Sequence, residues 1–500
     1  MVASCGVRRV SAAGSSRGVS RADAPQRHNG AVSPRSVVLG LVALLLLPAP
    51  LRACVADCNA DRRVEIAEIV SAVRIALDEL PLAACAPADG DGDQRVAIDE
   101  LLAAVATALN APLCAPAVSP SPRPTPTASP LPVAERRVNL QTAGSQRHPD
   151  LALIAGGGAL VVWSGPSGTS EGTRIIVRRI DAAGEPGAEE ITLSDGDADD
   201  ARPRIAALAG GGFAVTWERA VAGRSDIRLR LLDASGQPSA PSQRVPTASL
   251  RRQERPAIAA ASDGGFLVAW QADDSTDGSR RDDVLVRAFE GDGRPRGDER
   301  RVNERPPLDH WQHEPDLSAA ADGRLLAVWA RSTFGSSARG IGARWLDEMG
   351  APLSDELAVQ DHTAIVNEAP AVVVGANGEP LVLWSRRDDG MANTRLIVSR
   401  DGIVGPFLDG TEAQSGSALA VGGGTVVAAW QAFATDDDRW DAYARYLTPD
   451  GGEVFRLHDH TASSQEAPRI ALAADGALFA VWQSFGQDRS GYGIYARVFK

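Results

Sequence analysis

The sequence lacks several features that would assign it to a familiar functional class. Basic residues are not in excess, because 51 Lys and Arg face 64 Asp and Glu, and the net charge of -13 argues against a nucleic-acid partner. The apolar run at 37–47 is only eleven residues long, too short to span a bilayer. The sequence also has no G-x-S-x-G nucleophile motif and no phosphate-binding loop.

Residues 1–53 have the character of an export signal. Basic residues scattered between Arg8 and Arg35 precede the apolar run, and the segment ends in LPAPLRAC. This order is typical of a signal peptide. We therefore expect a secreted protein, extracellular or periplasmic, with no transmembrane span in the mature chain. LRAC at 51–54 also resembles a bacterial lipobox, which would instead anchor the chain through a lipid on Cys54.

Cysteine is scarce, and its distribution bears on this choice. Four cysteines follow the signal segment, namely Cys54, Cys58, Cys85 and Cys114. In an oxidising compartment four cysteines form two disulfides, whereas lipidation of Cys54 would leave one without a partner. The count therefore favours simple secretion. Three pairings remain open.

Residues 54–114 contain a repeat with a period of 32 residues. DCNADRRVEIAEIVSAVRIAL at 57–77 aligns with DGDGDQRVAIDELLAAVATAL at 89–109. Each copy has oxygen-bearing side chains at places 1, 3 and 5, an apolar residue at 8 and Glu at 12, and an apolar-periodic helix follows. Calcium takes six to eight oxygen ligands, which this spacing supplies from a single loop. We predict two Ca²⁺ sites, with the second loop favoured.

The ligands predicted for these sites come from both loops. They are Asp57, Asn59, Asp61, the Arg63 carbonyl and Glu68 in the first, and Asp89, Asp91, Asp93, the Arg95 carbonyl and Glu100 in the second. Place 6 normally holds glycine, because that residue needs a positive φ. Here it holds Arg62 and Gln94, so the alternative is a pair of loops that only cap their helices.

Two loop–helix repeats without a leading helix resemble the type I dockerin family. The resemblance covers about 60 residues and implies calcium-dependent folding and docking onto a cohesin-like protein. Dockerins usually carry Asp at place 12, so Glu68 and Glu100 depart from the family and are closer to EF-hand loops. The departure bears on cohesin binding more than on calcium binding.

The remainder of the chain is a Pro-rich linker at 115–134 and a repetitive domain at 135–500. Seven tryptophans recur in that domain, with a glycine six residues before each. A proline stands fourteen residues before six of them, and Gly416 takes that place in the sixth repeat. Each repeat predicts four short antiparallel strands, which is the pattern of a propeller blade.

Seven repeats predict a mainly β fold, a seven-bladed β-propeller preceded by the small all-α module. The segment at 135–142 is a spare fourth strand that would complete the last blade and close the ring. The repeats resemble W-Q-S-x-G-x-D…Y-x-R-x-F units of some large secreted bacterial proteins, most clearly in WQSFGQDRSGYGIYARVF at 482–499. The repeated tryptophans should fill space between blades. An arginine repeated in the third strand should form an inter-blade hydrogen bond.

Function should lie where the repeats differ, on the face with loops of variable length. Those loops gather carboxylates and aromatic side chains, of which Trp311, Asp436, Asp438 and Trp440 are the ligand-face candidates. Aromatic faces beside carboxylates suit sugars, so we expect a binder of a glycan or protein ligand; a merely solvated acidic rim is the alternative. A second function is a propeller glycoside hydrolase or lyase carried by the dockerin-like module. No carboxylate pair stands out, the sialidase-type S-x-D-x-G-x-T-W box is absent, and His310 and His313 have no third metal ligand in view.

Overall fold

A computed structural model describes most of residues 133–500 and parts of the N-terminal module. In the module it describes residues 58, 66–77, 80–85, 88, 95–96 and 101. In the repetitive domain it omits 169–171, 197, 222, 249–251, 274–281, 305–309, 334–338, 362–364, 389–393, 401–402, 408–412, 435–438 and 448–451. None of the helices in these described parts is long and apolar enough to cross a membrane.

The chain divides into two compact units, residues 1–125 and 126–500. In the first, α1 (Ile66–Ala76) and η1 (Leu82–Ala84) are joined to the described part of the loop by a disulfide between Cys58 and Cys85. A small apolar cluster lies beside this disulfide and includes Ala72 and Ile75 of α1. One of the pairings left open by the sequence is thus resolved. Cys54 and Cys114, and most of the predicted second helix, lie outside the described residues.

The second unit is a ring of seven four-stranded antiparallel blades. Its inner strands are β2 (Arg147–Leu153), β6 (Asp199–Ala207), β10 (Arg252–Ala260), β14 (His310–Ala319), β18 (Ile365–Val374), β22 (Gln414–Gly422) and β26 (Gln465–Leu472). The second strands are β3 (Ala159–Pro166), β7 (Phe213–Val221), β11 (Phe266–Asp273), β15 (Leu325–Thr333), β19 (Pro380–Asp388), β23 (Thr425–Ala434) and β27 (Leu478–Phe485).

The outer half of each blade is built in the same way. The third strands are β4 (Thr173–Ile180), β8 (Arg224–Leu232), β12 (Asp282–Phe289), β16 (Arg339–Leu346), β20 (Arg395–Arg400), β24 (Arg439–Tyr446) and β28 (Tyr492–Phe499). The fourth strands are β5 (Ile191–Thr192), β9 (Gln243–Arg244), β13 (Arg300–Arg301), β17 (Leu357–Gln360), β21 (Ile403–Pro406), β25 (Val454–Arg456) and, from the N-terminal side, β1 (Arg136–Arg137).

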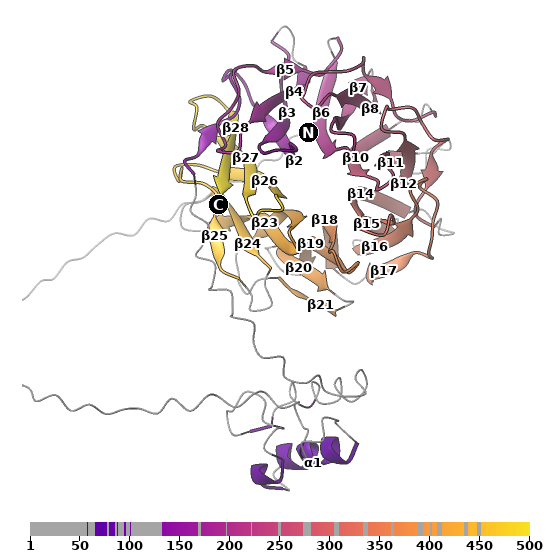
Figure 1. The fold of residues 1–500 in the computed structure, drawn as a ribbon, viewed down its shortest axis with the longest axis vertical. Coiled ribbons are helices and arrows are strands. Elements are labelled where there is room, and N and C mark those ends of the chain that lie inside the picture. The colour runs from indigo at the N-terminus through magenta and orange to yellow at the C-terminus, as the bar shows by residue number, and fades with distance from the viewer. Residues whose placement is uncertain are drawn as a thin grey trace, which may run out of the picture. The chain divides into compact units, whose positions relative to one another are not determined.

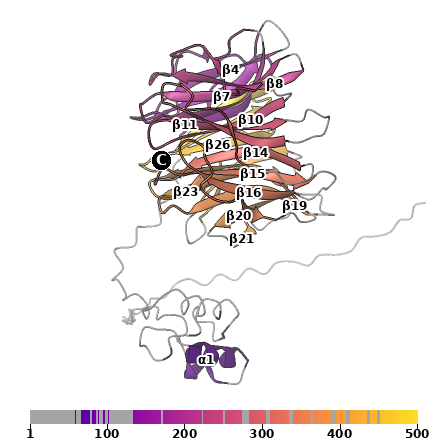
Figure 2. The same ribbon diagram turned by 90° about the vertical axis from the view of Figure 1, so that its right-hand side faces the viewer.

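The inner strands follow one another around the centre of the ring, and β26 meets β2 (Figure 1). Figure 2 shows the blades from the side, with their strands running through the thickness of the ring. A single bridge between Asp282 and Trp311 also links the third and fourth blades. The ring closes as predicted, because β1 pairs with β28 through Arg136↔Ala496 and Arg137↔Tyr495.

The repeated tryptophans form a buried layer between blades, which confirms their structural role. All seven are at most 1 % exposed: Trp163, Trp217, Trp270, Trp329, Trp384, Trp430 and Trp482. Each packs against the preceding blade; Trp329 of blade 4, for example, lies among Leu267 and Val286 of blade 3. In five blades the indole N–H donates to a Gln or Asn seventeen residues earlier, as Trp270 does to Gln253 at 3.0 Å.

Blade 2 departs from this pattern. Asp200 stands where the other blades have the amide, and it forms a buried two-point ion pair with Arg219, with both N···O distances at 2.7 Å. The indole N–H of Trp217 has no hydrogen-bond partner among the described residues. The pair therefore replaces one repeated hydrogen bond with a local charge pair.

The repeated third-strand arginines join neighbouring blades, as the sequence predicts. Arg287 donates from Nε to the Gly297 carbonyl of its own blade at 2.8 Å, and from Nη1 to the Val245 carbonyl of the preceding blade at 2.7 Å. The same pair of contacts recurs at Arg178, Arg230, Arg344, Arg445 and Arg497. The guanidinium fork thus fastens six of the seven blades to their predecessors.

A bulge at the repeated proline shapes every inner strand. The residue before the proline has a positive φ, for example 53° at Arg255, and the register of the strand shifts by one residue there. In blade 6 the bulge consists of Gly416 and Ser417, and Gly416 has φ 66°. The 1–2 hairpin of this blade is one residue shorter, closing through Gly422↔Thr425. Gly416 therefore corresponds to the residue before the proline, which corrects the alignment made by distance from the tryptophan.

Candidate functional site at the channel mouth

All seven inner strands line a cavity of about 430 Å³ in the centre of the ring. Its lining includes both bulge residues in most blades, together with the next residues along each strand. The bulges lie near the start of the inner strands, at the end of the ring that also carries the loops between second and third strands. This is the face that the sequence selects as functional.

The residues that precede the proline form what we call the mouth ring. In blades 1 to 4 they are His148, Arg202, Arg255 and Glu314, and in blades 5 to 7 they are Ala369, Gly416 and Ala467. One half of the mouth therefore carries long polar side chains, and the other half carries almost none. Here the sevenfold repeat is broken, and the small side chains leave room for a ligand.

Polar side chains that follow the tryptophans hold the mouth ring in place. The Gln483 side chain accepts the His148 backbone N–H at 3.1 Å, and Gln271 and Gln431 accept the equivalent N–H groups of Glu314 and Ala467. Each glutamine belongs to the preceding blade. The repeated Trp-Gln pair is thus a device for fixing the bulge, which leaves the side chain of the bulge residue free to vary.

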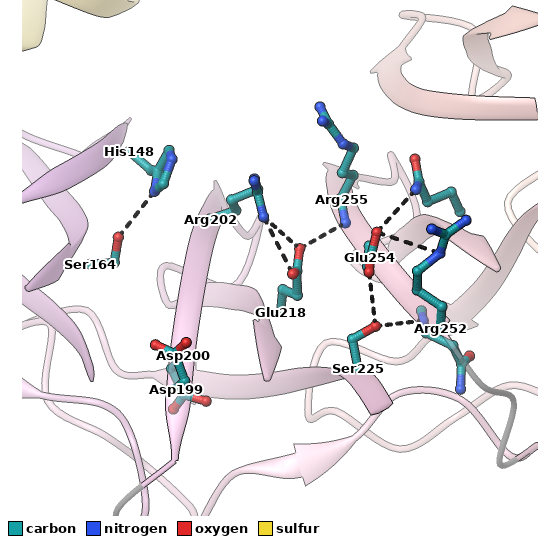
Figure 3. A network of polar contacts seen from close by, with 12 residues as sticks. His148, Ser164, Asp199, Asp200, Arg202, Glu218, Ser225, Arg252, Glu254 and Arg255 are labelled. Atoms are coloured by element: carbon teal, nitrogen blue, oxygen red, sulfur yellow. Dashed lines mark hydrogen bonds and ion pairs between the residues drawn. The ribbon is translucent and has the colours of Figure 1, made fainter. Parts of the chain in front are cut away.

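Two arginines of the mouth ring are paired with partly buried carboxylates. Arg202 bonds both oxygens of Glu218, at 3.3 and 3.1 Å, and Arg255 bonds Glu314 at 2.6 Å. The two guanidinium side chains are 42 % and 44 % exposed, whereas the carboxylates are 13 % and 17 % exposed. Figure 3 shows Glu218 between the two arginines. The mouth consequently offers hydrogen-bond donors to an incoming ligand.

His148 lies beside these arginines with a defined tautomer. Its Nδ1 is 3.2 Å from the Ser164 hydroxyl, whose single hydrogen goes to the Arg147 carbonyl at 3.0 Å. The hydroxyl must therefore accept from His148, which places the proton on Nδ1 and leaves the lone pair on Nε2. Burial lowers the pKa of His148 to about 4, with Arg202, Arg147, Arg469 and Arg255 adding to the effect. The ring is neutral at ordinary pH.

The floor of the cavity carries four charged residues, one position after the repeated proline. Arg204 reaches past blade 3 to bond Asp316 of blade 4 at 2.9 Å. Asp316 also accepts the Val372 N–H at 3.0 Å, and Asp150 accepts the Ile205 N–H at 3.0 Å. Burial raises the pKa of Asp316. The fourth residue, Arg469, donates to two main-chain carbonyls, at 3.3 and 3.4 Å, and to no other group that the structure describes.

A second polar group lies beside the mouth on blade 7. The Tyr492 hydroxyl donates to Glu466 at 2.9 Å, and the Gln483 amide donates to the other oxygen of Glu466 at 3.2 Å. The Arg147 guanidinium lies 4.2 Å from the centre of the Tyr492 ring. Phe485 packs against Tyr492 at 5.1 Å and is 48 % exposed. Tyr492, Glu466 and His148 are thus connected through Gln483.

The ligand-face residues proposed from sequence are only partly described. Trp311 is the second residue of β14 in blade 4 and is half-buried. Trp440 is the second residue of β24 in blade 6, with its ring 5.3 Å from that of Phe433. The two aromatic residues therefore belong to different blades. Asp436 and Asp438 lie outside the described residues. The described side chains contain no group of three metal-binding residues, and His313 lies 3.9 Å from Glu314 with its pKa lowered to about 4 by burial.

Of the ten predicted calcium ligands, the structure describes Glu68 and Arg95. Glu68 lies in the first turn of α1, is 7 % exposed and accepts the Cys58 N–H at 2.9 Å. The carboxylate at place 12 therefore lies against the second residue of its own loop. Asp57, Asn59, Asp61, Arg63, Asp89, Asp91, Asp93 and Glu100 lie outside the described residues.

Sequence reasoning missed the four polar residues of the mouth ring. The repeated proline marks the scaffold in the sequence, whereas the residue before it differs from repeat to repeat. Read as a column, the residues before the proline are His, Arg, Arg, Glu, Ala, Gly and Ala, once blade 6 is aligned through its shorter hairpin. The sequence shows this variation, but it does not show that these residues face a channel.

Comparisons with known proteins place this chain only at a distance. No family model matches the sequence, and no curated protein matches it. Among solved structures, the polysaccharide lyase Uly1 superposes with a TM-score of 0.48 at 10 % identity, covering 72 % of this chain and 91 % of the lyase. An ulvan lyase gives 0.47 at 11 % identity, with 73 % and 94 % covered. The α-L-arabinanase of Penicillium chrysogenum gives 0.43 at 11 % identity, with 73 % and 98 % covered. These values are too low to bear on function.

Proposed function

We propose that the propeller recognises a glycan at the channel mouth. The observation that carries this proposal is the broken symmetry of the mouth ring, which sets His148, Arg202 and Arg255 opposite Ala369, Gly416 and Ala467. A cavity of about 430 Å³ is within the range of sites for small ligands, including one or two sugar residues. Exposed guanidinium groups offer paired donors to sugar oxygens. Phe485 and Tyr492 add apolar surface beside the mouth for the CH face of a sugar.

A retention assay tests this proposal. Wild type and Arg255→Gln would be passed over a panel of immobilised polysaccharides, with Arg179→Gln as the matched control because Arg179 is exposed on β4. We expect Arg255→Gln to weaken retention of the preferred glycan about tenfold, equivalent to about 1.4 kcal/mol. The control should bind like wild type. Retention of no glycan, or equal retention by both variants, would contradict recognition at the mouth.

A second candidate function is cleavage of the bound glycan, as a hydrolase or lyase. It is favoured by two neutral groups that are connected through Gln483, namely His148, which lines the cavity, and Tyr492 on blade 7. The neutral His148 has a free lone pair on Nε2, which suits a general base. Burial and the bond to Glu466 raise the pKa of Tyr492 to about 12, so its hydroxyl remains protonated and can act as a general acid. Release of reducing ends, or ultraviolet absorbance from an unsaturated product, would be abolished by His148→Gln and by Tyr492→Phe. Cleavage that survives both variants would contradict these roles.

For the N-terminal unit we propose a secreted, calcium-folded docking module. The observation behind it is the return of Glu68 onto its own loop, and the Cys58–Cys85 disulfide supports an oxidising compartment. Glu68 with Asp57, Asn59, Asp61 and the Arg63 carbonyl would hold the first Ca²⁺, and the second loop would hold another. Calcium bound only by the folded unit stabilises it by about 2.7 kcal/mol at 100-fold excess over Kd. Calorimetry of the full chain with calcium and with chelator should show this shift, and Glu68→Gln should reduce it. A cohesin-like protein remains the proposed partner.

A further inference from the structure

The floor of the channel contains one guanidinium that is not directly paired with a carboxylate among the described residues. Arg204 is paired with Asp316 across the channel, and Asp150 is turned toward blade 2 by its bond to the Ile205 N–H. Arg469 has no carboxylate within 4.0 Å among the described residues. Its guanidinium uses one nitrogen, Nη1, for long bonds to the Ser417 and Pro468 carbonyls. Among the described residues the other N–H groups of Arg469 have no acceptor, and they are open to the channel.

The surroundings of Arg469 favour an anion. Arg469 lines the cavity and is half-buried, and its position inside the ring together with Arg204 lowers its pKa to about 10. A guanidinium still carries its charge at that value, so the charge is present and only distantly compensated by Asp150 and Asp316. Buried charges are normally paired or hydrogen-bonded. An anionic group of a ligand would supply the missing acceptor.

Space for such a group is available on one side only. Arg469 belongs to blade 7, and the equivalent floor positions of blades 5 and 6 are Ala371 and Ala418. Above them the mouth ring contributes Ala369, Gly416 and Ala467, which are also small. An entering group therefore has a path from the mouth to Arg469 along blades 5 to 7, with Arg202 and Arg255 on the facing side.

We propose that Arg469 is the specificity-determining residue of the channel and receives a carboxylate of an acidic glycan. This inference rests on the proposed glycan recognition and narrows its substrate class to chains that contain uronic acid. A planar carboxylate matches the guanidinium fork and can accept two parallel N–H bonds. A neutral sugar would leave the floor charge unpaired and would bind more weakly.

The test compares each acidic glycan with its own neutral form. Polygalacturonate and alginate, and the same polymers after reduction of their carboxyl groups, would be measured against wild type, Arg469→Gln and Arg469→Lys. We expect wild type to prefer at least one acidic form by about tenfold or more, equivalent to about 1.4 kcal/mol. Arg469→Gln should lose that preference and Arg469→Lys should keep part of it. Equal binding of acidic and reduced forms by wild type would overturn the inference.

A second measurement separates this inference from the proposed function. If no polymer binds, the proposed glycan recognition is wrong. A comparison of free glucuronate with glucose then tests the anion site at Arg469 independently of that proposal. Glucuronate should raise the melting temperature of wild type and not that of Arg469→Gln, whereas glucose should have no effect on either. No difference between the two sugars would refute the anion site. Because Arg469 has no ion pair to lose, Arg469→Gln should melt no lower than Arg179→Gln; a clearly lower melting temperature would assign Arg469 a structural role instead.

Discussion

The tryptophan layer and the mouth ring are built from the same seven repeats, yet they behave in opposite ways. The layer holds one residue type in every blade, and all seven side chains are buried against the preceding blade. The mouth ring holds five residue types in one backbone conformation, with positive φ throughout. The contrast separates residues that the ring requires in order to close from a position at which the residue type can vary. Packing constrains the first region, whereas the bulge tolerates any side chain that can point into the channel.

The largest expected effect lies in the constant region. Trp329→Ala would leave a cavity between blades 3 and 4 and an acceptor, Gln312, without its indole donor at 2.6 Å. We expect a loss of about 3–5 kcal/mol in the free energy of unfolding, measured by denaturant titration. Trp311→Ala is the matched control, because Trp311 is a half-buried tryptophan on the loop face. Equal losses for the two variants would break the distinction between the regions.

The sequence predicted the constant region almost completely. A tryptophan, a glycine and a proline at fixed spacing define the blade, and closure by the segment at 135–142 follows from counting strands. The inter-blade arginines followed from their repetition, because a group present in nearly every blade serves the scaffold. These features depend on local pattern, and pattern is what a single sequence displays.

The candidate site was harder to predict because it is formed by residues that are far apart in the sequence and are brought together only by the fold. His148 and Arg469 are 321 positions apart in the sequence and meet only when the ring closes. The bulge that turns Arg202 and Arg255 into the channel depends on a positive φ at non-glycine residues, which sequence does not reveal. The predicted loop face is the same end of the ring as the mouth ring. However, the loop residues predicted from the sequence are not among the described residues that line the cavity.

The second prediction concerns the cost of keeping a histidine neutral in the mouth ring. The pKa of His148 is about 4 in the folded state against 6.5 as its ordinary value, so between these values the unfolded chain binds a proton that the folded chain does not. Stability therefore falls as the pH drops from about 6.5 to 4, by up to about 3 kcal/mol for this residue. His148→Gln should reduce the slope of that part of the stability profile and leave pH 7 to 8 unchanged, with the rest of the slope carried by groups such as His313, whose pKa is lowered over the same range. Parallel profiles for wild type and variant would show that His148 does not carry the effect.

The third prediction tests the link between the two regions. Gln483 follows Trp482 and fixes the mouth ring by accepting the His148 N–H and donating to Glu466. Gln483→Ala would leave both groups without this partner, at a cost of about 1–2 kcal/mol. Gln483→Glu should not recover the loss, because it keeps an acceptor for the His148 N–H but sets a second carboxylate against Glu466. Hydrogen exchange at His148 should increase in the alanine variant; an unchanged rate there would mean that the glutamine is dispensable to the bulge.

The smallest change in stability, with a large change in binding, is expected from Ala369→Arg. The φ of 50° at Ala369 equals that of Arg202, so an arginine already occupies this conformation in blade 2. The substitution should alter the free energy of unfolding by about 0.5 kcal/mol or less, because alanine already bears the strain of the positive φ and the new side chain faces open space. Its side chain would fill the open half of the mouth and should abolish ligand retention, whereas Ala369→Ser should bind like wild type. If Ala369→Arg destabilised the ring as severely as Trp329→Ala, the mouth ring would belong to the scaffold, and its variation would need another explanation.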